Sequence, residues 1–207
     1  ARLILPILSE SFESPTTALI DHFPPRLGEW GGESASIVAS PPGSSPLHGD
    51  RVLSLDTAAD SNLGYLQQII DVSGLPLAKE GEMRTIEAIA SFHSEGPGEL
   101  ERYTLRLASF QESPGAIRGL WEGTSWREMD ANTLTTAKAG LTAPSDARGW
   151  QTISAVVEGP ADARSLVISL AAGRLDPTAP KTPHYLDDVR ADLVISPRVN
   201  RIRPKKR

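Results

Sequence analysis

The sequence contains no cysteine among its 207 residues. This absence excludes disulfide bonds, zinc-thiolate sites and thiol catalysis, although it does not identify the compartment in which the protein works. Long apolar runs are also lacking. The most apolar opening segment, residues 3–8, is too short to span a bilayer and contains Pro6, so it is interpreted as a first strand or as a stub left after processing. We therefore expect no membrane partner.

The chain has no excess of positive charge, since its formal net charge is −5 at pH 7. Nucleic-acid binding depends mainly on neutralising phosphates with Lys and Arg, so we expect no nucleic-acid partner. The one basic cluster lies in residues 198–207 and is interpreted as a solvated tail or linker. A linker there predicts that the domain belongs to a larger multidomain chain.

Helical periodicity is nearly absent, whereas segments with period 2 recur between clusters of Gly, Pro, Ser and Asp. No repeat of fixed period is visible, which disfavours propellers and solenoids. Residues 1–197 are predicted to form one domain with about eleven strands. The expected strands are residues 3–8, 35–39, 51–56, 64–71, 83–93, 101–110, 117–122, 132–138, 150–157, 165–172 and 184–195.

The alternation within these segments predicts which face is buried. In residues 102–108, Tyr103, Leu105 and Leu107 share one face, while Arg102, Thr104 and Arg106 share the other. The alternating sets Ile153, Ala155, Val157 and Leu166, Ile168, Leu170 predict further one-sided burial. Two sheets stacked on such faces make an all-β, two-sheet antiparallel sandwich.

Several motifs occur in an order that is informative as a set. They are Ser11-Phe12-Glu13, residues 48–55 (HGDRVLSL), residues 64–69 (GYLQQI), residues 102–105 (RYTL), residues 149–152 (GWQT) and residues 185–189 (YLDDV). In this order and spacing the chain resembles the galactose-binding-like β jelly rolls that include xylan- and glucan-type carbohydrate-binding modules. The resemblance covers most of the chain and implies a jelly-roll sandwich.

The resemblance also implies a structural calcium ion (Ca²⁺) that ties the N-terminal segment to the last strand. It would place ligand oxygens at the Ser11 backbone, the Glu13 side chain, the Gly49 backbone and Asp187, with Asp188 as the alternative acid. Calcium takes six to eight oxygen ligands, which carboxylates and backbone carbonyls supply. The competing interpretation is that Asp187 and Asp188 alternate on an edge strand, one solvated and one bonded to a turn.

Aromatic residues are scarce, at 5% of the chain, and exposed rings are the usual platform for sugars. Phe12, Trp30, Tyr103 and Trp150 are predicted to pack in the core or at its rim. Two rings surrounded by polar and turn residues are better candidates for a glycan site, and several polar residues could lie beside them. The predicted ligand-binding set is Trp121, Trp126, Tyr65, Gln67, Arg106, Glu122 and Arg127. In the alternative interpretation, both Trp rings close one end of the sandwich.

No catalytic constellation is visible. The four histidines, His22, His48, His93 and His184, lack metal-ligand spacing, and there is no Gly-x-Ser-x-Gly elbow. A carboxylate pair for glycoside hydrolysis could be drawn from Glu87, Glu101, Glu122 and Asp130, but sequence does not give their separation. We expect a non-catalytic glycan-binding domain of a secreted or cell-surface protein. The alternatives are a structural or interaction domain without a sugar site, and a glycan-active hydrolase or lyase.

Overall fold

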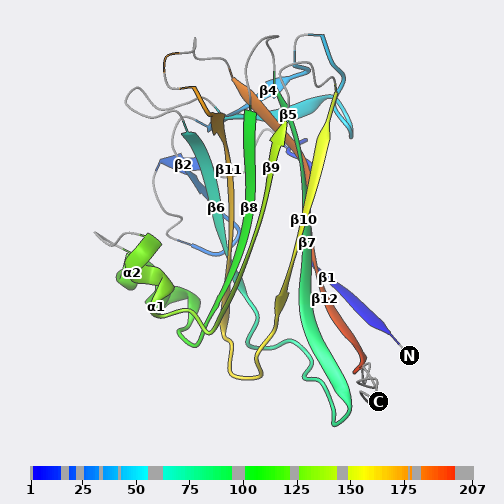
Figure 1. Cartoon of the computed structure of the whole chain (residues 1–207), viewed down its shortest axis with the longest axis vertical. Helices are drawn as coiled ribbons and strands as arrows, with labels where there is room; N and C mark the ends of the chain where they lie inside the picture. Colours follow the sequence, from blue (N-terminus) through cyan, green and yellow to red (C-terminus); the bar gives the residue numbers. More distant parts are fainter. Residues whose placement is uncertain are drawn as a thin grey trace, which may run out of the picture.

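The chain forms two stacked β-sheets with two short helices on the outer side of one sheet (Figure 1). The computed structural model describes residues 2–14, 19–21, 26–32, 35–41, 43–55, 63–94, 101–121, 126–143, 149–176, 178 and 183–198. Only the backbone is described for residues 20, 21, 126 and 127. No helix in these ranges is long and apolar enough to cross a membrane.

The first sheet is built around its longest strand, β12, which has neighbours on both sides. The order is β10-β7-β12-β5-β4, and β1 pairs with the remainder of β12 beyond β5. All these pairs are antiparallel. The strands are β1 (Leu3–Glu10), β4 (Ala35–Ala39), β5 (Arg51–Leu55), β7 (Glu82–Ser94), β10 (Gln151–Glu158) and β12 (His184–Pro197).

The second sheet has the order β2-β3-β6-β11-β8-β9. It is antiparallel except for the short pair β2 and β3, which run parallel. The strands are β2 (Leu19–Asp21), β3 (Trp30–Gly32), β6 (Leu63–Asp71), β8 (Glu101–Phe110), β9 (Thr135–Ala143) and β11 (Ser165–Arg174). β11 and β8 are the central strands that later position the candidate site.

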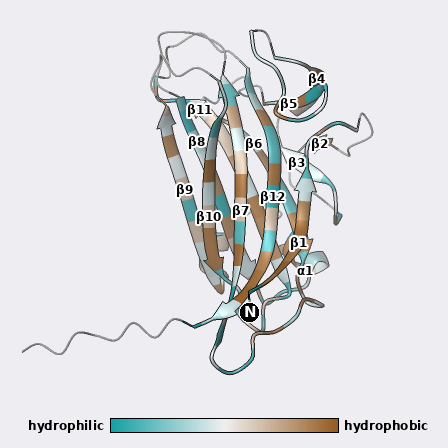
Figure 2. Cartoon of the chain, turned by 90° about the vertical axis from the view of Figure 1, so that its right-hand side faces the viewer, coloured by the Kyte–Doolittle hydropathy of each residue, from teal (hydrophilic) through white to brown (hydrophobic). Residues whose placement is uncertain are grey.

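The core lies between the sheets, and strand alternation decides which side chains enter it. Along β8, Tyr103, Leu105 and Leu107 are fully buried, whereas Arg102 points to the outer face. Figure 2 shows the corresponding alternation of hydrophobic and hydrophilic residues along the first sheet. The predicted inward faces of β10 and β11 are confirmed as well. The predicted two-sheet antiparallel sandwich is therefore confirmed.

A polar cluster closes one end of this apolar core and joins the two sheets. His184 on β12 lies 2.6 Å from Glu101 on β8, and Arg174 on β11 lies 3.4 Å from the same carboxylate. The Tyr103 hydroxyl donates to Ser94 Oγ at 3.0 Å, and burial raises the pKa of Tyr103 to about 12. Buried charges need partners of this kind, so the cluster is interpreted as structural.

The helices are α1 (Pro114–Trp121) and α2 (Trp126–Asp130), and they correct the strand predicted at 117–122. The Ser113 carbonyl accepts hydrogen bonds from the amides of Ala116 and Ile117. These bonds form the first turn of α1, which begins at Pro114. Ile117 is fully buried against the outer face of the second sheet. The prediction was wrong because eight residues hold too few turns to show a helical period.

The other ten predicted segments all overlap strands. The segment predicted at 132–138 begins later, at Thr135, and extends to Ala143. Two strands of three residues, β2 and β3, were not predicted because they are too short to show alternation. In the predicted tail, residues 199–207 lie outside the described residues.

The rings of Phe92 and Tyr103 stack in the core, with their centroids 4.9 Å apart. Substituting Phe92 tests how much this packing stabilises the sandwich. We expect Phe92→Ala to lower the free energy of unfolding by about 3–5 kcal/mol, because it leaves a cavity at a fully buried position. The control Val156→Ala changes a 55% exposed side chain in the same sheet and should cost about 0.5 kcal/mol or less. Urea unfolding measures both. Similar losses for the two variants would contradict the assigned core.

Candidate functional site

A groove of about 610 Å³ lies on the outer face of the second sheet. Its lining comes from four adjacent strands and from the last residue of α1. The lining residues are Leu63, Tyr65, Gln67, Arg102, Thr104, Arg106, Trp121, Lys138, Ser169, Leu170 and Ala171. The strand residues point outward, with the exception of Leu170, because alternation sends their neighbours into the core. The alternation of side chains along the strands therefore produces both the core and the groove.

Small side chains of β11 form part of the groove's floor. Ser169 lies between Gln67 on β6 and Arg106 on β8 in the strand register. One step along, Ala171 lies between Tyr65 and Thr104. Since larger side chains stand on both neighbouring strands, the small residues of β11 leave a trough between them.

Trp121 forms the boundary between the groove and a covered part of the same face. On the covered side, α1 and α2 pack Ile117 and Met129 over an apolar row of the sheet, and Trp121 packs against this cluster. The apolar row consists of Ile69, Ala108, Phe110 and Val167. Figure 1 shows the two helices beside this sheet. The half-buried Trp121 therefore contacts the cluster and also lines the groove.

Polar contacts fix several groove residues. The Gln67 amide donates to Ser169 Oγ at 3.3 Å across the floor. Arg106 forms a close ion pair with Asp130 at the end of α2, which ties the helix to β8. Partial burial lowers the pKa of the Arg106 guanidinium below its ordinary value. Gln67 and Arg106 are thus held in place without a ligand.

The structure brings four of the seven predicted ligand-binding residues together: Tyr65, Gln67, Arg106 and Trp121 all line the groove. Glu122 and the side chains of Trp126 and Arg127 lie outside the described residues. The alternation of residues 102–106 had placed Arg102 and Thr104 on the same face as Arg106, and this signal could have added both to the set. Lys138 and Ser169 could not be found without the strand register.

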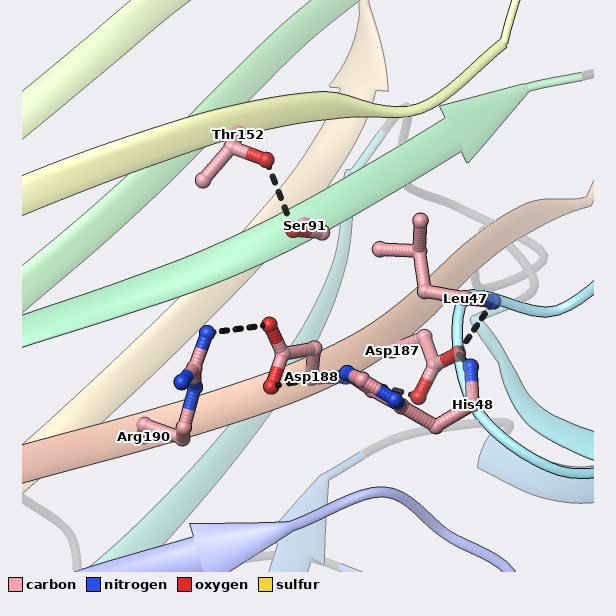
Figure 3. A network of polar contacts seen from close by, with 7 residues as sticks. All are labelled: Leu47, His48, Ser91, Thr152, Asp187, Asp188 and Arg190. Carbon is pink, nitrogen blue, oxygen red and sulfur yellow. Dashed lines mark hydrogen bonds and ion pairs between the residues drawn. The ribbon is translucent and has the colours of Figure 1, made fainter.

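A second polar site gathers two of the predicted metal ligands around residues 47–51. The Asp187 carboxylate accepts hydrogen bonds from the amides of Leu47 at 2.8 Å and His48 at 3.1 Å (Figure 3). The Glu13 carboxylate accepts from the amides of Asp50 and Arg51, both at 3.0 Å. These two acids therefore join the segment after β1 and the last strand to one loop. We call this arrangement the clasp.

Each of the three segments in the clasp contains a residue in the left-handed region. Phe12 has φ 56°, Asp188 has φ 52° and Gly49 has φ 60°. Such values are unfavourable for residues other than glycine, and they persist where the surroundings enforce them. Phe12 is fully buried, and its amide donates to Glu10 at 2.8 Å. The clasp is therefore a place where the fold holds strained backbone.

The two acids of the clasp differ in their electrostatics. Hydrogen bonds from the Asp50 and Arg51 amides lower the pKa of Glu13. Burial raises the pKa of Asp187, although three amides donate to it. The edge-strand part of the competing interpretation is wrong, because β12 has neighbours on both sides. Its other part is confirmed for Asp187, which is bonded to the turn that contains Leu47 and His48. Asp188 binds Arg190 at 2.8 Å and lies 3.5 Å from His48.

The clasp contains carboxylate oxygens, which are one kind of ligand that calcium takes. A carboxylate offers about four lone-pair sites, and amide donors use two of them at Glu13 and three at Asp187. Asp187 is also fully buried, and a cation beside it would compensate the cost of burying its charge. Among the described residues no three His, Asp or Glu side chains cluster as metal ligands. Backbone carbonyls, such as those predicted at Ser11 and Gly49, would therefore have to complete the shell.

Comparison with solved structures shows what the fold resembles. A cyclase from Fischerella sp. TAU has a TM-score of 0.54 at 14% identity, and the match covers 97% of this chain and 100% of that one. The CBM22-1 xylan-binding domain of Xyn10C from Paenibacillus barcinonensis has a TM-score of 0.50 at 13% identity, covering 91% and 94%. TmCBM61, solved with β-1,4-galactotriose, has a TM-score of 0.46 at 11% identity, covering 79% and 86%.

No family model and no curated protein matches the sequence. The structural likeness confirms the predicted resemblance in fold to xylan-type carbohydrate-binding modules. The same likeness extends to a cyclase. Since one fold serves both, the function has to be argued from the site.

Substituting Gly49 tests whether the clasp depends on the close approach of the Glu13 carboxylate to this residue. A Cβ at Gly49 would overlap the Glu13 carboxylate, whereas a Cβ at Gly43, which also has positive φ, meets no atom within 4 Å. We expect Gly43→Ala to cost about 1 kcal/mol from backbone strain. Gly49→Ala should cost at least about 2 kcal/mol more, because it also displaces Glu13. Urea unfolding of both variants measures the difference, and equal losses would argue against the clasp.

Proposed function

We propose that this chain is a non-catalytic glycan-binding domain and that the groove on the second sheet holds the sugar. The observation that carries the proposal is the half-buried pair Tyr65 and Trp121, which line one groove with a floor of small residues. The C–H faces of sugar rings pack on aromatic rings, and a floor of small side chains leaves room for them.

The polar lining supplies the second half of sugar recognition. Thr104 and Ser169 offer hydroxyl groups, and Gln67 offers an amide already oriented by Ser169. Sugar hydroxyls both donate and accept hydrogen bonds, so they match this mixed set. We include the predicted residues Trp126, Glu122 and Arg127 in the proposal as further contacts from the segment that follows α1.

The fold supports the proposal, because it resembles that of the CBM22-1 xylan-binding domain of Xyn10C. By the same likeness we propose that the chain is part of a secreted or cell-surface protein with further domains. The competing functions are a structural or interaction domain and a glycan-active enzyme. The structural likeness to a cyclase is the reason to retain the enzyme as an alternative. Release of reducing ends from any glycan that binds would favour the enzyme.

We also propose that the clasp binds a structural Ca²⁺ ion. Glu13 and Asp187 would supply carboxylate oxygens, the Ser11 and Gly49 backbones would supply carbonyl oxygens, and Asp188 is the alternative acid. A divalent cation would stabilise the buried charge of Asp187 and hold the segment after β1 against β12. The groove is lined by the other sheet, so the ion would have a structural role.

Tyr65 provides the sharper test of the groove, because it can be changed in two ways. We expect Tyr65→Ala to weaken binding to a glycan identified on an array by about tenfold or more, since the ring platform is lost. Tyr65→Phe keeps the ring and should retain most of the affinity. Isothermal titration calorimetry measures both.

Trp121→Ala should have a similar effect on binding, but it also removes packing against the cluster under α1. The comparison of Tyr65→Ala with Tyr65→Phe is therefore the decisive test of the groove. Glycan binding that survives both alanine variants would place the ligand elsewhere on the molecule, and no binding on a broad array would favour the structural alternative.

Calcium removal tests the clasp. We expect a chelator to lower the melting temperature of the wild-type chain and added Ca²⁺ to restore it, because an ion that binds only the folded state stabilises that state. Asp187→Asn should abolish this response, whereas Asp192→Asn, on the same strand outside the clasp, should leave it intact. A melting temperature that is insensitive to chelation in the wild type would rule out the ion.

A further inference from the structure

The groove has the opposite charge from the chain as a whole. Three of its lining side chains are cationic, Arg102, Arg106 and Lys138, and no described acidic residue lines it. The chain nevertheless has a formal net charge of −5. A concave surface that concentrates one sign of charge attracts ligands of the other sign. The positive charge of the groove therefore favours a negatively charged ligand.

The strand register makes this concentration of charge costly. Arg106 on β8 and Lys138 on β9 lie directly opposite each other on the outer face. Like charges in directly opposed positions of an antiparallel pair destabilise the sheet. Asp130 offsets the positive charge of Arg106 through an ion pair. Lys138 has no such ion pair among the described residues. A neutral residue at position 138 would remove the repulsion between these two opposed cations.

Arg102 adds a third cation on the same face, four residues before Arg106. At about 3.4 Å per residue the two backbone positions are ~13 Å apart. Arg102 and Lys138 are both exposed, and neither has an ion-pair or hydrogen-bond partner within the described parts of the chain. The groove thus has a positive charge near each end of the Arg102–Arg106 stretch.

We propose that the ligand of the groove is an acidic glycan whose charge comes from uronic acid carboxylates. This inference rests on the proposed function of the groove and names its ligand class. A guanidinium binds a planar carboxylate through two parallel hydrogen bonds, and a lysine ammonium binds it as a point charge. Arg102 and Lys138 are the residues that select the charged sugar.

The spacing of the cations favours a glycan of low charge density over other polyanions. Tyr65 and Trp121 need uncharged sugar faces to pack against, and these are present on a neutral glycan that bears uronic acids at intervals. A heavily sulfated glycan or a nucleic acid would bring many more charges than two uncompensated cations neutralise. The groove is therefore matched to sparse carboxylates.

The experiment compares two forms of the same polymer. Glucuronoxylan and glucuronoarabinoxylan, whose uronic acids are sparse along a neutral chain, are each tested beside their carboxyl-reduced forms, which keep the sugar chain and lack the charge. We expect at least one acidic polymer to bind about tenfold more tightly than its reduced form. Raising NaCl from about 0.05 M to about 0.5 M should remove most of that difference, because salt screens exposed charges.

Matched variants assign the selectivity to residues. The double variant Arg102→Gln with Lys138→Gln should lose about tenfold in affinity for the acidic polymer and little for the reduced one. The control Lys79→Gln removes an exposed cation outside the groove and should change neither. Circular dichroism and melting temperature show whether each variant remains folded.

The outcomes separate this inference from the proposed function. If acidic and reduced polymers bind equally and Tyr65→Ala weakens both, the groove binds glycan but the inference is overturned. If no polymer binds in either form, the inference is overturned, and the proposed function is overturned as well only if no glycan on the broad array binds. Equal binding of dextran sulfate or single-stranded DNA that is insensitive to Tyr65→Ala would show unselective charge attraction and would also overturn the inference.

Discussion

The groove depends on one constraint, the unequal size of the side chains on the two faces of β11. Inward-pointing Leu166, Ile168 and Leu170 are fully buried in the core. The outward positions Ser169 and Ala171 are small and lie between larger residues of β6 and β8. Since side chains alternate along a strand, one sequence builds both the core and the trough. Large residues at the two outward positions would fill the groove without disturbing the sandwich.

The same strand also sets where the groove ends. Val167 points outward one step before Ser169 and is buried under α1 and α2 with Ile69 and Ala108. The outer face therefore changes from apolar and covered to polar and open between two successive outward positions. Trp121 stands at this change because it is the last residue of α1. The helices position the ring and limit the length of any ligand that lies in the groove.

The sequence was sufficient to predict most strands and their buried faces, because alternation is a local signal. It also predicted that Trp121 would lie near Tyr65, Gln67 and Arg106. It could not predict that Arg106 faces Lys138, since the partner of a residue depends on strand order and register, which are set by contacts far apart in the chain. The helix α1 was missed because its eight residues hold too few turns to show a helical period.

The molecule separates its acidic and basic functional groups between its two sheets. The acids Glu13 and Asp187 serve the clasp, which joins the first and last strands of the first sheet to the 47–51 loop. The cations line the groove on the second sheet. The acidic ligand proposed for the groove would meet no described carboxylate among the lining residues, and the clasp would keep the negative charge on which the proposed calcium site depends. This separation explains how a chain of net negative charge can have a groove lined by cations.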